Sequence, residues 1–198
     1  MKPVVYGGAR SKLAWRALVA VLSLALGLGV VNLTLPLLLG TINGSPLEFT
    51  EPPVDNSLPG RAVPILDSPH IAVGERGKVP YNSIPPTSGV HYPVTPALGV
   101  YQAPMPEELQ VHALEHGHVG IQYAADTPAD AVRAMERLAG RFPDDVFVAP
   151  YPKLKHGIAL TAWGRIDTFD TFDQNRVVTF VHALAGRYNH GWVARKGG

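Results

Sequence analysis

Three residues in one short segment have the types and the spacing of metal ligands. His112, Glu115 and His116 occur in the sequence VHALEHG, at residues 111–117. Residues four apart on a helix share a face, so both imidazoles would point to one place with Glu115 beside them. Neutral imidazole nitrogen suits zinc and copper. The segment is not the HExxH motif of zinc proteases, because its glutamate adjoins the second histidine instead of the first.

Two further histidines each follow a stretch that forms turns. His91 ends the sequence PPTSGVH, and His70 ends the sequence SPH. Gly89 precedes His91 by two residues and allows backbone conformations that other residues rarely adopt. For a lone pair of histidines, a hydrogen bond to a loop carbonyl is the commoner explanation. The positions of His70 and His91 favour a metal site over that explanation.

The elements that would position these histidines are readable from Pro106 onward. Pro106 followed by two acids indicates a helix start, and Gly117 indicates its end. Thr127 is the expected N-cap of a second helix. From His70 to Pro106, frequent prolines and glycines predict ordered loops with short strands. Apolar spacing predicts the remaining elements: helices at 127–142 and 173–187, and strands at 119–123, 146–149 and 158–163.

This order of elements predicts an α+β domain. The sheet would be small and antiparallel or mixed, because helices and strands do not alternate regularly. We expect helices to cover the sheet on one face, and a long Pro/Gly-rich loop layer to accompany them.

An uncharged segment near the N-terminus predicts a transmembrane helix. Residues 17–39 form a run of 23 residues without a charge, which is long enough to span a bilayer. Four basic residues precede the run, so residues 1–16 would be a cytoplasmic tail and the domain would be extracytoplasmic. A cleaved signal peptide is the alternative, but no small-x-small site closes the run. We expect a signal anchor, a Pro-rich linker at 40–69 and a domain at 70–198.

The composition excludes several kinds of site. The chain has no cysteine, which excludes disulfides, thiolate catalysis, iron–sulfur clusters and zinc held by cysteine. Of its 17 basic residues, four precede the uncharged run, which leaves 13 against 16 acids, a net charge of −3. This balance gives nucleic-acid binding no electrostatic basis.

Together these motifs resemble a known bacterial family, the domain-of-unknown-function family 3105. The resemblance spans roughly residues 70–188 and rests mainly on PPTSGVHY at 85–92 and VHALEHG at 111–117. It implies one N-terminal membrane helix or signal before an extracytoplasmic domain, and it implies no established activity. It marks five residues as matches to the motif positions of the family: His70, His91, His112, Glu115 and His116.

We predict that the four marked histidines bind one copper or zinc ion, with Glu115 as a ligand or as the partner of a ligand. Four residues would support the ligands by hydrogen bonds: Tyr81, Tyr92, Tyr101 and His118. A closed site with four ligands would indicate structure, storage or delivery, whereas three ligands and an open position would indicate catalysis. Two alternatives stay open. The domain could be a metal-dependent enzyme with Glu115 as acid and base, or a non-catalytic interaction domain beside a membrane-protein partner.

Overall fold

The computed structural model describes residues 57–192. No helix within this range is long and apolar enough to cross a membrane. The expected transmembrane helix at 17–39 and the tail at 1–16 lie outside the described residues and stay predictions.

A mixed sheet forms the centre of the domain. Its strands are β1 (Arg61–Ala62), β2 (Gly99–Val100), β3 (Val119–Tyr123), β4 (Val146–Pro150), β5 (Ile158–Ala162) and β6 (Arg165–Phe169). Their order across the sheet is β1-β6-β5-β3-β4-β2. The pairs β2–β4 and β3–β4 are parallel, and the other pairs are antiparallel. Ile121 in the centre lies opposite Val148 on one side and Leu160 on the other. The α+β class and the mixed form of the sheet are confirmed.

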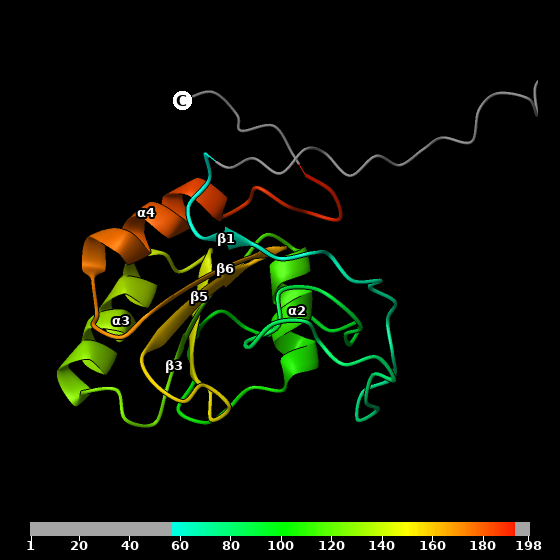
Figure 1. Cartoon of the computed structure of the whole chain (residues 1–198), viewed down its shortest axis with the longest axis horizontal. Coiled ribbons are helices and arrows are strands. Elements are labelled where there is room, and N and C mark those ends of the chain that lie inside the picture. The colour runs from blue at the N-terminus through cyan, green and yellow to red at the C-terminus, as the bar shows by residue number, and fades with distance from the viewer. Residues whose placement is uncertain (1–56, 193–198) are drawn as a thin grey trace, which may run out of the picture. The chain divides into compact units, whose positions relative to one another are not determined.

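Helices cover both faces of this sheet, not one (Figure 1). Helix α2 (Glu107–Glu115) lies on one side, and α3 (Ala129–Arg141) and α4 (Gln174–Leu184) lie on the other. The reason is visible in β4, where Val148 belongs to the core with α3 and α4, and Phe147 packs in the core with α2. Successive residues of a strand point to opposite faces, so an uninterrupted apolar strand is buried on both.

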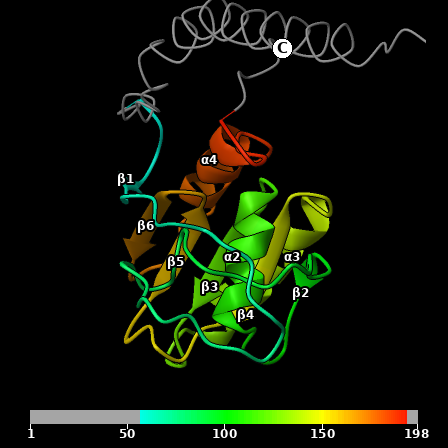
Figure 2. The same ribbon diagram turned by 90° about the vertical axis from the view of Figure 1, so that its right-hand side faces the viewer.

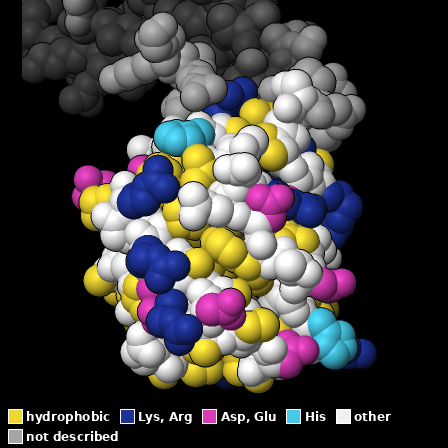
Figure 3. Space-filling view, turned by 90° about the vertical axis from the view of Figure 1, so that its left-hand side faces the viewer, with side chains coloured by type: hydrophobic (Ala, Val, Ile, Leu, Met, Phe, Trp, Pro, Cys, Tyr) yellow, Lys and Arg dark blue, Asp and Glu magenta, His cyan; other side chains and the backbone are white. Residues whose placement is uncertain are grey.

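The two helices on the α3 and α4 side have apolar inner faces and polar outer faces. Met135 and Leu138 of α3 are buried, whereas Arg133 and Arg137 are exposed. Figure 3 views the domain from this side, where basic side chains lie among acidic and apolar ones. This pattern is the one expected of a helix with one face on a core and one in solvent.

The two helices begin differently. The Asp173 carboxylate accepts hydrogen bonds from two backbone N–H groups in the first turn of α4, as an N-cap does. Helix α3 begins after Pro128 without a side-chain cap. The expected Thr127 cap was wrong, because the Thr127 hydroxyl donates instead to the carbonyl of Gly157.

Irregular chain from residue 63 to residue 98 forms the predicted loop layer over α2 (Figure 2). Its PPTSG segment, residues 85–89, is buried. The Gly164 N–H donates to the Thr87 carbonyl at 3.0 Å, and the Leu66 N–H donates to the Ser88 hydroxyl at 2.9 Å. Residues 57–69, from the expected linker, also lie along the domain and supply β1 at the sheet edge. Helix α2 is therefore enclosed between sheet and loops, and seven of its nine residues are buried.

Candidate metal centre

Backbone hydrogen bonds hold His70 and His91 side by side. The two residues form an isolated parallel bridge between two loops. The N–H of Ile71 donates to the carbonyl of His91 at 2.9 Å, and the N–H of His91 donates to the carbonyl of Pro69 at 3.3 Å. The two imidazole rings consequently lie 4.8 Å apart, centroid to centroid. Two loops that are distant in sequence thus present their rings together.

Helix α2 supplies the other two members of the cluster, His112 and Glu115. The ring of His112 lies 5.4 Å from that of His70 and 5.2 Å from that of His91. One ligand atom each from His70, His91, His112 and Glu115 can be chosen so that all lie within 4.8 Å of one another. We call these four residues the inner group. The cluster could therefore hold a metal ion.

The hydrogen bonds of His91 require a proton or a metal ion between its Nε2 and the carboxyl group of Glu115. His91 is fully buried, and its Nδ1 lies 2.8 Å from the carbonyl oxygen of Gly89, which can only accept. Nδ1 therefore carries a proton, and Nε2 of the neutral ring carries a lone pair. That Nε2 lies 2.9 Å from Oε2 of Glu115, which also carries lone pairs. Two lone pairs at this distance repel unless a proton or a metal ion lies between them.

His112 supplies an unpaired donor atom to the same place. Its side chain is 7% exposed, and its buried Nδ1 has no hydrogen-bond partner among the described residues. Nδ1 lies 4.0 Å from Oε2 of Glu115. Burial, and then the neighbouring rings of His116 and His91, lower the pKa of His112 to about 4. The ring is therefore neutral at pH 7, which is the form that binds a metal.

The inner group is buried on one side and open on the other. The side chain of Glu115 is 10% exposed, whereas that of His70 is 48% exposed. An ion could reach the buried donors past His70 without unfolding of α2.

The other two histidines near the end of α2 lie outside the inner group. His116 is the residue at which α2 ends, and its ring lies 4.6 Å from that of His112. It forms a second possible group with Glu115 and His190. His118 belongs to neither group within residues 57–192, and burial followed by the nearby His116 lowers its pKa.

Three tyrosines that were predicted to support the ligands bond the backbone. The Tyr81 hydroxyl donates to the carbonyl of Val90 at 2.7 Å, and that of Tyr92 donates to the carbonyl of Glu75 at 3.0 Å. The Tyr101 hydroxyl donates to the carbonyl of Ala97. Tyr81 thus fixes the loop directly before His91. Direct support of a metal-bound histidine by these tyrosines or by His118 stays a prediction.

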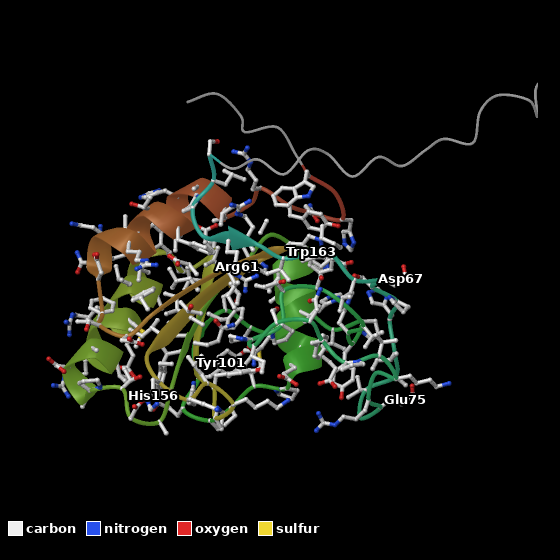
Figure 4. All side chains as sticks on the ribbon, viewed as in Figure 1. Arg61, Asp67, Glu75, Tyr101, His156 and Trp163 are labelled. Atoms are coloured by element: carbon white, nitrogen blue, oxygen red, sulfur yellow. The ribbon has the colours of Figure 1, made fainter. Side chains whose placement is uncertain are left out.

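His156 is an exposed histidine that lies apart from the inner group and has different neighbours. Trp163 lies beside the group, with its ring 6.4 Å from that of His91. His156 follows β4 and lies 2.9 Å from a carboxylate oxygen of Asp126. In Figure 4, His156 is labelled at the lower left of the domain and Trp163 near its top, well apart in this view. His156 is therefore a suitable control for substitutions in the cluster.

Comparison with known families confirms the resemblance found in the motifs. The model of the family described as "Protein of unknown function (DUF3105)" matches residues 72–195. The match covers more than half of the chain, and the chain belongs to this family. The chain has no match among the curated proteins or among the solved structures. The matched range includes His91, all of α2 and His190, and it begins just after His70.

Sequence reasoning did not place His190 among the candidate ligands, although the fold brings it to this place. His190 lies in a short polar segment near the C-terminus, where neither spacing nor flanking turns distinguish it. Its Nδ1 nevertheless lies 3.5 Å from Oε2 of Glu115. Only the tertiary fold brings it there.

Proposed function

We propose that this protein binds a transition-metal ion, copper or zinc, through His70, His91, His112 and Glu115. The observation that carries the proposal is the buried Nδ1 of His112, which has no hydrogen-bond partner within residues 57–192. His112 lies in one group with three other donor residues, from two loops and a helix. Leaving a buried polar atom unpaired costs about 1–3 kcal/mol. A bound metal ion removes this cost, because it accepts the lone pair of the neutral ring.

The donor set supports the choice of metal. Three imidazole nitrogens and one carboxylate oxygen suit zinc or copper, whereas calcium and magnesium prefer oxygen alone. A tetrahedral zinc site takes four protein ligands when its role is structural. The inner group offers four, which favours storage, delivery or structure over catalysis at this ion.

A purely hydrogen-bonded cluster is the competing explanation, and it corresponds to a non-catalytic interaction domain. A second proton on His91 would satisfy its contact with Glu115. The same proton does nothing for Nδ1 of His112, which lies 4.0 Å from that carboxylate oxygen. A metal ion satisfies both residues at once, and the proposal rests on this difference.

The proposed location is the extracytoplasmic side of a membrane, with the domain anchored by residues 17–39. The uncharged run and the four preceding basic residues support this orientation. A reporter fused after Gly198 that is active only outside the cytoplasm should be active. Activity of a reporter that works only in the cytoplasm would contradict the proposed orientation. Recovery of a mature N-terminus near Thr41 would replace the anchor with a cleaved signal.

Metal analysis of the purified protein tests the proposed function. The full chain, produced without a histidine tag and dialysed against zinc, should retain zinc when its metal content is measured by mass spectrometry. His91→Ala should lose the ion of the inner group, and the matched control His156→Ala should retain it. Absence of metal from the wild type, or equal metal in wild type and His91→Ala, would overturn the proposal.

A further inference from the structure

A second set of donors lies against the inner group. One ligand atom each from Glu115, His116 and His190 can be chosen so that all lie within 4.8 Å of one another. The rings of His116 and His190 are 4.6 Å apart and nearly perpendicular. We call these three residues the outer group. Its exposed member is His190, with 54% of the side chain accessible, so solvent reaches this group directly.

Specific contacts of the C-terminal segment hold His190 against the end of α2. The backbone N–H of His190 donates to the carbonyl of Glu115 at 3.2 Å. The N–H of Gly186 donates to the carbonyl of Gly117 at 2.9 Å. The ring of Tyr188 stacks on Trp163 with centroids 4.8 Å apart. The segment from 186 to 192 is thus fixed at three points beside the helix end.

Two backbone features show how closely this segment approaches the end of α2. Gly117 has a φ of +88°, and a Cβ there would lie 2.4 Å from the carbonyl oxygen of Tyr188. Only glycine fits at this position. His190 has a φ of +51°, a conformation that costs a residue with a side chain about 1 kcal/mol or more and that is common at functional sites.

Glu115 belongs to both groups, and a carboxylate has two oxygens that can each bind a cation. Its Oε2 lies within 4.0 Å of a ring nitrogen from each group, namely Nδ1 of His112 in the inner group and Nδ1 of His190 in the outer group. The inner group has four protein ligands, whereas the outer group has three. Three ligands at an accessible position are the arrangement of zinc sites that bind a water or a substrate.

We infer that the protein holds two transition-metal ions bridged by Glu115, with the second ion bound by His116 and His190 at an open, solvent-accessible position. This inference rests on the proposed function, because Glu115 must also bind the inner ion. Two ions that share a carboxylate lie about 3.5–4 Å apart in known two-metal sites. The outer ion is the one that can exchange with solvent or bind a small oxygen or nitrogen ligand.

Metal stoichiometry in matched variants tests the inference. The full chain without a tag is dialysed against Zn²⁺, and bound zinc is counted per chain. We expect two ions in wild type and in His156→Ala, and one ion in His190→Ala. One ion in both wild type and His190→Ala would overturn the second site while the proposed function stands. Two ions in His190→Ala, or one ion in wild type and none in His190→Ala, would also overturn it. No bound zinc in wild type would overturn the proposed function itself.

The bridge has a separate signature in the cobalt-loaded protein. Two Co²⁺ ions joined by one carboxylate couple magnetically, so the electron paramagnetic resonance signal per cobalt should fall as the second equivalent is added. His190→Ala, with one ion, should give the full signal. An unchanged signal per cobalt in wild type carrying two ions would show that Glu115 does not bridge them.

Discussion

Replacing His112 by alanine should remove the part of the domain's thermal stability that the inner metal ion contributes. A ligand that binds only the folded state at a free concentration 100 times its Kd adds about 2.7 kcal/mol to the free energy of unfolding. For a domain of this size, each kcal/mol shifts Tm by about 3 °C. The wild type should therefore melt about 8 °C higher with zinc than with a chelator. His112→Ala removes a ligand that is buried at the centre of the inner group, so it should lose the part of the shift that the inner ion contributes.

The assay is thermal unfolding of the full chain followed by intrinsic tryptophan fluorescence, since Trp163 lies beside the inner group. His156→Ala is the control and should keep the shift of about 8 °C. The reasoning is refuted if His112→Ala retains the full shift. It is also refuted if chelation leaves the wild-type curve unmoved after the metal is verified as absent.

Three further predictions test other parts of the account. The unfolded chain binds a proton at His112 near pH 6.5, whereas the folded, metal-free domain binds it only near pH 4. Between these values protons favour the unfolded chain. The free energy of unfolding should therefore fall by about 3 kcal/mol as the pH drops through this window. Urea unfolding should show this fall, His112→Asn should reduce it, and equal slopes in both proteins would contradict it. Gly117→Ala should displace the segment that carries His190 and reduce bound zinc from two ions to one, and two retained ions would contradict the contact described. Phe180→Ala, in the core on the opposite face of the sheet, should cost about 3–5 kcal/mol in urea unfolding without changing zinc affinity, and a cost below about 1 kcal/mol would contradict that core.

The predictable part of the fold was the part with strong apolar periodicity. Three helices and the strands β3, β4 and β5 occur close to their expected positions. Strands β1 and β2 have two residues each, which leaves no periodicity to detect. Strand β6 has the sequence RIDTF, in which charged residues interrupt the apolar pattern. Its place in the sheet depends on antiparallel pairing with β5, which is a tertiary property.

The arrangement of helices on both faces was also implicit in the sequence. The strand VFVAP of β4 is apolar at successive positions, and such strands are buried on both faces. The expectation of helices on one face did not use this property. Helix α2 is mostly buried, its polar residues included, because loops cover the side that the sheet does not. That loop packing cannot be derived from helical spacing.

The candidate site was predictable where local geometry determines it. The spacing of His112 and Glu115 places them together on any helix, and the turn before His91 restricts its backbone. The separation of His116 from the inner group was not predictable, since His116 lies at the C-cap, where the helical geometry ends. The position of His190 depends on the stacking of Tyr188 on Trp163, a contact between residues 25 apart in sequence.

An anomalous difference map from crystals of the zinc-loaded protein, measured at the zinc absorption edge, tests the central claim most directly. We predict a peak about 2.0–2.1 Å from a ring nitrogen of each of His70, His91 and His112, and about 2.0–2.2 Å from an oxygen of Glu115. No peak in the inner group, together with His91 Nε2 bonded directly to Glu115, would contradict the claim. That result would assign the histidines to the hydrogen bonding of loops.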